Sequence, residues 1–152
     1  SRESNVDKTE IDAIVRRSEQ AAHALMNGDP SQFDAFITQK DDFTIFGPTG
    51  GPAPMKGSAE WRKVAPNAAK IFKKGEAKVE LFEAYTSGDL LVLVLLEHQT
   101  VTFEGDSESQ SWSQRVTQVY RREEDDWKIV HRHIDPLVKK RTLDEAKIIA
   151  KA

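Results

Sequence analysis

The first part of the chain has the hydrophobic spacing of an amphipathic helix. Between Asp7 and Asn27, apolar residues recur every three or four positions, which places them on one helical face. They are Ile11, Ile14, Val15, Ala22, Leu25 and Met26. Asp7 and Glu10 fit a capping box at the start, and Asn27-Gly28 predicts the end of the helix.

Two further helices are predicted before the chain changes character. Asp29 can act as the N-cap of the second, with Pro30 at its first position and Phe33, Phe36 and Ile37 on its inner face. Ser58 can cap the third helix, which carries Trp61 and Val64. Because proline lacks a backbone N–H, we expect this helix to break or kink near Pro66.

Extended strands dominate the second half. Phe43–Phe46 predicts a short early strand, and 77–85, Leu90–Phe103 and the two runs within 115–135 predict four long antiparallel strands joined by turns. Thr142 and Glu145 form a capping box, so a short C-terminal helix should follow. Three helices followed by a run of strands indicate an α+β fold with the helices on one face of a bent sheet.

The segment Gly47–Gly57 interrupts this pattern. Seven of its eleven residues are glycine or proline, a composition that excludes both a helix and a central strand. Loops of this length in compact domains are often functional. We therefore expect this loop to border the entrance of a pocket.

Composition restricts the class of protein. A length of 152 residues suits a single domain spanning 1–152. With 22 basic and 25 acidic residues, the net charge of −3 argues against a general nucleic-acid binder. The longest apolar run, Leu90–Leu96, is too short for a membrane span. We expect a cytoplasmic protein, although the start Ser1–Ser4, which lacks methionine, leaves a removed signal peptide open.

The strand near residue 130 carries the candidate chemistry. Trp127, Ile129, His131, His133 and Asp135 occupy alternate positions, so an unbroken strand would place all five on one face. Two imidazoles and a carboxylate would then continue an apolar face toward a polar cavity. Two other readings are open: the strand runs out into solvent, or the two histidines bind a metal. The chain has no cysteine and no third histidine nearby, so we expect neither a metal site nor a cofactor.

Other polar and aromatic residues extend this candidate site. Glu97 and His98 lie at the end of the apolar strand on opposite faces, and the one that points inward should have a perturbed pKa. Trp61 and Tyr85 are either core residues or aromatic walls of a pocket. We assign His98, Trp61 and Tyr85 as ligand-binding candidates, together with His131.

Several segments together resemble the SnoaL-like branch of the nuclear transport factor 2-like superfamily. They are a Gly-Asp-Pro corner at 28–30, Asp-Phe-Thr-Ile-Phe-Gly-Pro at 42–48, Gly57, a Gly-Asp turn at 88–89, Arg-Val-Thr at 115–117 and Trp-Lys-Ile-Val-His-Arg-His at 127–133. The resemblance covers roughly residues 8–138. The last segment is the most specific, and it also resembles the association domain of calcium/calmodulin-dependent kinase II.

The resemblance implies a fold and a site. Members form an α+β cone in which three N-terminal helices close over the concave face of a bent sheet, usually as a dimer through the sheet. It favours a hairpin register that puts Arg115 on the face of the two histidines, whereas another loop length would substitute Gln114, Val116 and Gln118. It also implies that Asp42 faces the pocket, because the residue at this position in the family often does so.

Two functional hypotheses follow. In the first, the protein is an isomerase, dehydratase or cyclase in which His133 with Asp42 or Asp135 transfers protons on a hydrophobic carbonyl compound, while Arg115 holds an oxygen. In the second, it is a non-catalytic domain that binds a small hydrophobic or carboxylate-bearing molecule or associates with itself. Because Leu90–Leu96 is apolar on both strand faces and helices can cover only one, we expect a homodimer in either case.

Overall fold

The computed structural model describes residues 6–152. The start Ser1–Ser4, on which the expectation about a removed signal peptide rests, lies outside the described residues. Within residues 6–152 the chain forms four helices and seven strands. In chain order they are α1 (Lys8–Met26), α2 (Ser31–Phe36), β1 (Thr44–Phe46), β2 (Met55–Lys56), α3 (Ser58–Ala69), β3 (Phe72–Ser87), β4 (Leu90–Phe103), β5 (Gln110–Ser111), β6 (Gln114–Glu123), β7 (Asp126–Asp135) and α4 (Leu143–Ile149).

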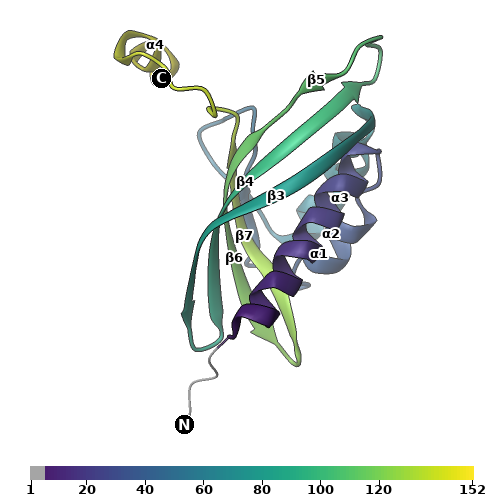
Figure 1. Ribbon diagram of the computed structural model, residues 1–152, viewed down its shortest axis with the longest axis vertical. Helices are drawn as coiled ribbons and strands as arrows, with labels where there is room; N and C mark the ends of the chain where they lie inside the picture. Colours follow the sequence, from purple (N-terminus) through teal and green to yellow (C-terminus); the bar gives the residue numbers. More distant parts are fainter. Residues whose placement is uncertain (1–5) are drawn as a thin grey trace.

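A single curved sheet organises the molecule. Its strands follow the order β2-β1-β7-β6-β4-β3, and β5 pairs with β4 outside this path. All neighbours are antiparallel except β1 and β7, which run parallel. Helices α1, α2 and α3 lie on one side of the sheet (Figure 1), which we call the inner face; the opposite side is the outer face. The predicted α+β architecture is confirmed, although the sheet stays open at β2 and β3.

The predicted N-caps form at both ends of the chain, but the complete capping box forms only in α4. The Asp7 side chain accepts a hydrogen bond from the Glu10 backbone N–H at 2.8 Å, as an N-cap should. The Glu10 carboxylate accepts from the indole N–H of Trp127 at 2.7 Å, which ties α1 to β7. The capping box of α4 forms between Thr142 and Glu145.

Predictions for α3 were wrong in two details. Gly57, in the left-handed region at φ 98°, occupies the N-cap position, and the Ser58 hydroxyl donates instead to the Gln39 carbonyl at 3.1 Å. The helix also continues through Pro66 to Ala69, so the expected break does not occur there, whereas a kink stays a prediction. Ser58 thereby holds α3 against the segment between α2 and β1.

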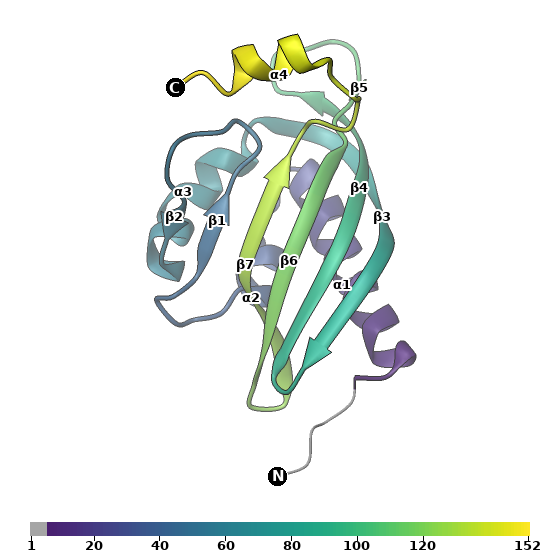
Figure 2. The ribbon, with the colours of Figure 1, turned by 90° about the vertical axis from the view of Figure 1, so that its left-hand side faces the viewer.

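The core lies between the inner face and the helices. Its completely buried side chains include Phe36, Phe43, Leu91, Leu93 and Ile129. Alternate residues of β4 point inward, and the intervening ones remain half-buried or exposed on the outer face. Helix α4 contributes no buried residue and lies beyond the end of the sheet (Figure 2).

A bulge in β7 changes which residues face inward. Val119 pairs with His131, but Tyr120 pairs with Ile129, so Val130 is an extra residue in the strand. An extra residue reverses the alternation beyond it. Trp127 and Ile129 therefore face inward together with Arg132 and Ile134, all at most 8% exposed.

Candidate functional site

The bulge contradicts the prediction that residues 127 to 135 share one face at every odd position. His131, His133 and Asp135 lie on the outer face, and His133 is exposed. The predicted hairpin register is nevertheless confirmed, since Arg115 pairs with Asp135 and Thr117 with His133. The prediction that Arg115 and His133 reach an internal cavity is therefore wrong, because the bulge at Val130 places His133 on the outer face and Arg115 shares that face.

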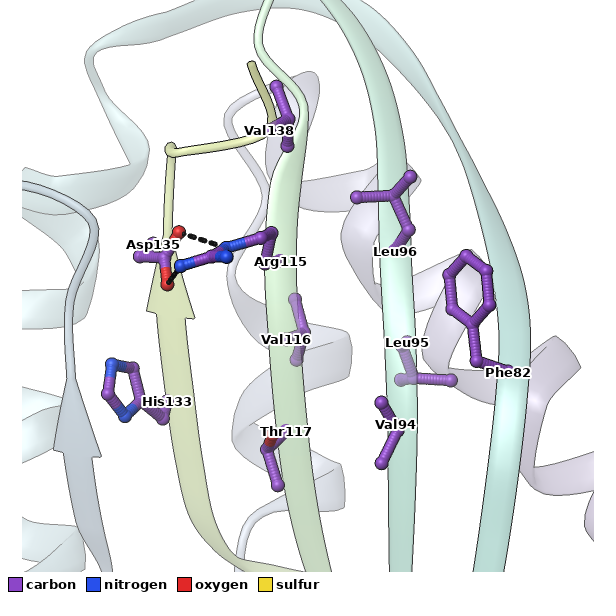
Figure 3. Close-up of a pocket in the computed structure, with 10 residues that line it drawn as sticks. All are labelled: Phe82, Val94, Leu95, Leu96, Arg115, Val116, Thr117, His133, Asp135 and Val138. Atoms are coloured by element: carbon purple, nitrogen blue, oxygen red, sulfur yellow. Dashed lines mark hydrogen bonds and ion pairs between the residues drawn. The ribbon is translucent and has the colours of Figure 1, made fainter. Parts of the chain in front are cut away.

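On the outer face, a shallow groove of about 480 Å³ is lined by Arg115, His133 and Asp135 (Figure 3). The Arg115 guanidinium donates to both carboxylate oxygens of Asp135, at 2.7 and 2.8 Å. This hydrogen bonding holds the pKa of Asp135 below its usual value. Phe82, Leu96 and Val138 form apolar parts of the groove. The ion pair joins β6 to β7 at the surface, which is the structural role for such a pair.

His131 contacts the neighbouring strand β1. One of its ring nitrogens, Nδ1, lies 2.7 Å from the Thr44 hydroxyl, and the ring of Phe46 packs edge-on against it. Burial lowers the pKa of His131, and the nearby His133 lowers it further. The same Phe46 ring lies 5.2 Å from the His133 ring, centroid to centroid.

The remaining predicted site residues are scattered. Asp42 forms an ion pair with Arg121 at 2.7 Å, and this hydrogen bond lowers its pKa. His98 lies 2.8 Å from Glu80 on the outer face, and Tyr85 is 60% exposed. Asp42, His133 and Asp135 therefore do not meet in a cavity, so the proton-transfer role assigned to them stays a prediction. Of the predicted residues, Trp61 lines the inner cavity described next.

A larger cavity, of about 670 Å³, lies on the inner face. Its walls are mostly apolar and come from α1, α2, α3 and the sheet; they include Phe33, Ile37, Ile45, Met55, Trp61 and Ile134. Trp61 is oriented by a hydrogen bond from its indole N–H to Asp34 at 3.1 Å. The loop Gly47–Gly57 lines one side of this cavity through Gly47, Pro48, Gly50 and Pro54 among others, as predicted for a loop bordering a pocket.

A buried ion pair marks the polar end of this inner cavity. The two terminal guanidinium nitrogens of Arg132 donate to the two carboxylate oxygens of Glu97, each at 2.9 Å. The side chains are 7% and 1% exposed, respectively. Burial of both charges is tolerated because each compensates the other, and the Arg132 guanidinium also lies 4.9 Å from the centre of the Phe33 ring. Of the two adjacent residues Glu97 and His98, Glu97 is therefore the one that faces inward.

Hydrogen bonds extend from this ion pair into the core. Arg132 donates to the Gln118 side-chain carbonyl, and the Gln118 amide donates to the Tyr120 hydroxyl. The Tyr120 hydroxyl in turn lies 2.7 Å from the Ser18 hydroxyl of α1. Complete burial raises the pKa of Tyr120 to about 12, so it stays protonated at neutral pH. This network fixes the orientation of Arg132 from behind.

Gln114 also lines the polar end and differs from its neighbours. It lies directly opposite Glu97 in the pairing of β6 with β4 and is 2% exposed. Neither its amide nitrogen nor its amide oxygen has a hydrogen-bond partner within residues 6–152. By contrast, the Gln99 amide donates to the Trp112 carbonyl at 3.0 Å.

The sequence contained one signal for these residues. Gln114 and Gln118 alternate with Val116 and Tyr120, so two amides recur on a face that otherwise reads as core. Their inward orientation corresponds to the alternative strand face that residue spacing had left open. Arg132 carried no such signal, because its inward position depends on the bulge.

Other classes of site leave no trace in the part of the chain that the structure describes. Across residues 6–152, no three histidine, aspartate or glutamate side chains gather as a metal site would require. None of the helices there is long and apolar enough to cross a bilayer.

Comparisons with known structures agree with this architecture. The chain is similar to a candidate dehydratase of the nuclear transport factor 2-like family from Streptomyces avermitilis, with 14% identity, a TM-score of 0.70 and coverage of 88% of this chain and 100% of the other. It is also similar to the association domain of calcium/calmodulin-dependent kinase II from Caenorhabditis elegans, with 15% identity, a TM-score of 0.63 and coverage of 86% and 98%. At these identities the likeness establishes the fold alone.

Comparison of the sequence with family models identifies the family of the chain. No curated protein sequence matches the chain significantly. The model of the SnoaL-like domain, however, matches residues 14–138, which span most of α1, helices α2 and α3, and the whole sheet. The chain therefore belongs to the SnoaL-like family, and its fold is similar to that of nuclear transport factor 2-like proteins.

Proposed function

We propose that the protein binds a small, mostly apolar molecule in its inner cavity. The observation that supports this proposal most strongly is the cavity of about 670 Å³, which combines apolar walls with a polar end at Glu97, Gln114 and Arg132. Binding pockets for small molecules have this character: a concave apolar surface with a few oriented polar groups. The apolar walls would supply affinity, and the polar end would orient the ligand.

The same geometry favours binding over proton transfer. Among the residues that line the cavity, Glu97 and Arg132 carry the titratable groups, and each holds the other in a two-point ion pair. A general base must be free to accept a proton from the substrate. Glu97 would first have to leave Arg132, at the cost of an unpaired buried charge.

A pair of matched variants tests the proposal. Ala68 and the adjacent Asn67 are both exposed on α3, but only Ala68 lines the cavity. We expect Ala68→Trp to weaken binding of the neutral aromatic ketone 4-butylacetophenone about tenfold or more, since the new ring occupies ligand space. Asn67→Trp should bind normally. Equal affinity in both variants, measured by calorimetry, would contradict the proposal.

We further propose that two copies associate through the outer face. Phe82, Tyr85 and Leu90 are between 46% and 60% exposed there, and they adjoin the half-buried Val94 and Leu96. A contiguous apolar surface of this kind is unusual on a monomer. The likeness to association domains supports the same conclusion. The occupant of this face would be a second copy of the chain.

A further inference from the structure

Gln114 is unusual because it lines the inner cavity and its buried amide group has no hydrogen-bond partner within residues 6–152. Within the described chain, the buried side-chain atoms without a hydrogen-bond partner are its amide nitrogen, its amide oxygen and Nε of Arg122. The Arg122 guanidinium packs on the Trp127 ring and does not line the cavity. An unpaired buried amide is unfavourable, so native proteins rarely retain one without a partner. Gln114 is therefore suited to a partner that occupies the cavity.

The charges beside Gln114 indicate the chemistry of that partner. Glu97 and Arg132 neutralise each other through two hydrogen bonds of 2.9 Å, so the polar end carries no net charge. A ligand carboxylate would lose its water and meet the carboxylate of Glu97, whereas an ammonium group would meet Arg132. Neither charged group gains a free counter-ion in this low-dielectric site. The polar part of the ligand should therefore be neutral.

We infer that Gln114 binds a neutral amide group of the ligand, such as a primary carboxamide or a lactam, through two parallel hydrogen bonds. The Gln114 amide N–H donates to the ligand carbonyl, and the Gln114 carbonyl accepts from the ligand N–H. Only a group that presents a donor and an acceptor side by side satisfies both atoms at once. This inference rests on the proposed function, and it replaces the carboxylate-bearing ligand expected from the sequence with an uncharged one.

Three ligands of nearly equal shape test the inference. 4-Butylbenzamide carries the amide, 4-butylacetophenone replaces its NH₂ by a methyl group, and 4-butylbenzoate replaces it by a negative oxygen. A site built around paired hydrogen bonds discriminates strongly against analogues that leave its polar atoms unpaired. The wild-type protein should therefore bind the amide about tenfold or more tightly than the ketone. The benzoate should bind more weakly than either.

The variant Gln114→Met removes the amide while keeping similar volume. It should bind the amide no more tightly than the ketone, because the two hydrogen bonds specific to the amide are lost. Gln110→Met, on the exposed strand β5, is the matched control and should retain the wild-type preference. The ligand-free Gln114→Met protein should also melt about 2–4 °C higher than wild type, because a buried unpaired group has been replaced by an apolar one.

The possible results separate the inference from the proposed function. Equal affinities of wild type for amide and ketone would overturn the inference and leave the proposed function intact. Tighter binding of the benzoate would overturn the argument from charge and the inference with it. If none of the three ligands bound to wild type, the proposed function would fail, and the inference would fail with it.

Discussion

The two faces of the hairpin β6–β7 each carry an arginine in a two-point ion pair with a carboxylate. On the inner face, Arg132 and Glu97 are 7% and 1% exposed; on the outer face, Arg115 and Asp135 are 56% and 27% exposed. The geometry is nearly the same, with distances of 2.7 to 2.9 Å. The two ion pairs differ in burial, and burial determines how strongly the loss of one partner affects the stability of the protein.

This contrast separates two sets of residues. Those predicted from the sequence lie on the outer face, and those of the proposed site lie on the inner face. The outer pair remains in contact with water, so it is screened and can be formed or broken at little cost. The inner pair has lost its water and is held by Gln118 from behind. A rigid, dehydrated polar group beside apolar walls can orient a ligand without reorganising.

The largest expected effect comes from breaking the inner pair. Arg132→Met leaves Glu97 buried without its partner, which should lower the free energy of unfolding by about 3–5 kcal/mol. The double variant Arg132→Met/Glu97→Met removes both charges and should recover much of this loss. Urea denaturation of the three proteins checks the prediction. A single variant as stable as wild type would show that the buried pair contributes little.

The next effect concerns the association of two copies. Leu96→Glu places a charge in the middle of the outer apolar surface and should weaken association by roughly 2 kcal/mol or more, about 30-fold. Thr100→Glu adds the same charge to the same face of β4 nearer its end and serves as the control. Sedimentation velocity measures both. A wild-type protein that is monomeric at micromolar concentration would contradict the association through the outer face.

A smaller effect is expected from breaking the outer pair. Arg115 is more than half exposed, so Arg115→Ala should lower the free energy of unfolding by at most about 1 kcal/mol. The Asp135 carboxylate that remains can be solvated. Urea denaturation, compared directly with Arg132→Met, sharpens the contrast between the two faces. A loss as large as that of the inner variant would mean that the outer pair is desolvated in the folded protein.

The smallest effect is a pH dependence of the outer pair. Hydrogen bonding from Arg115 lowers the pKa of Asp135 in the folded state. Its contribution to stability is therefore present above the unfolded pKa of about 3.9 and is lost as the pH falls through the folded pKa. Below pH 4, the stability difference between wild type and Asp135→Asn should shrink. A difference that stayed constant from pH 6 to pH 2 would contradict this assignment.

Much of the fold could be predicted because it depends on local signals. The long apolar run gave the bounds Leu90–Phe103 that β4 has in the structure, and Thr142 with Glu145 located the start of α4. These features arise from residues near one another in the chain, so spacing alone reveals them. The glycine- and proline-rich loop Gly47–Gly57 was likewise recognised as the border of a pocket.

The site could be predicted only in part because it depends on one extra residue. Val130 is an ordinary strand-forming residue, and nothing near it in the sequence marks it as a bulge. Up to Ile129 the alternation was read correctly, and beyond Val130 every side chain was assigned to the opposite face. His133 was consequently placed in the cavity, and Arg132, which belongs there, was overlooked.

The central claim is that the inner cavity, and not the outer groove, is the binding site. The most direct test is a crystal structure of the protein soaked with 4-butylacetophenone, a neutral ligand that does not presuppose the amide preference. We predict that the ligand lies between Trp61 and the polar end formed by Gln114 and Arg132. A ligand found instead beside His133 and Arg115 on the outer face, with the inner cavity free of it, would contradict the account.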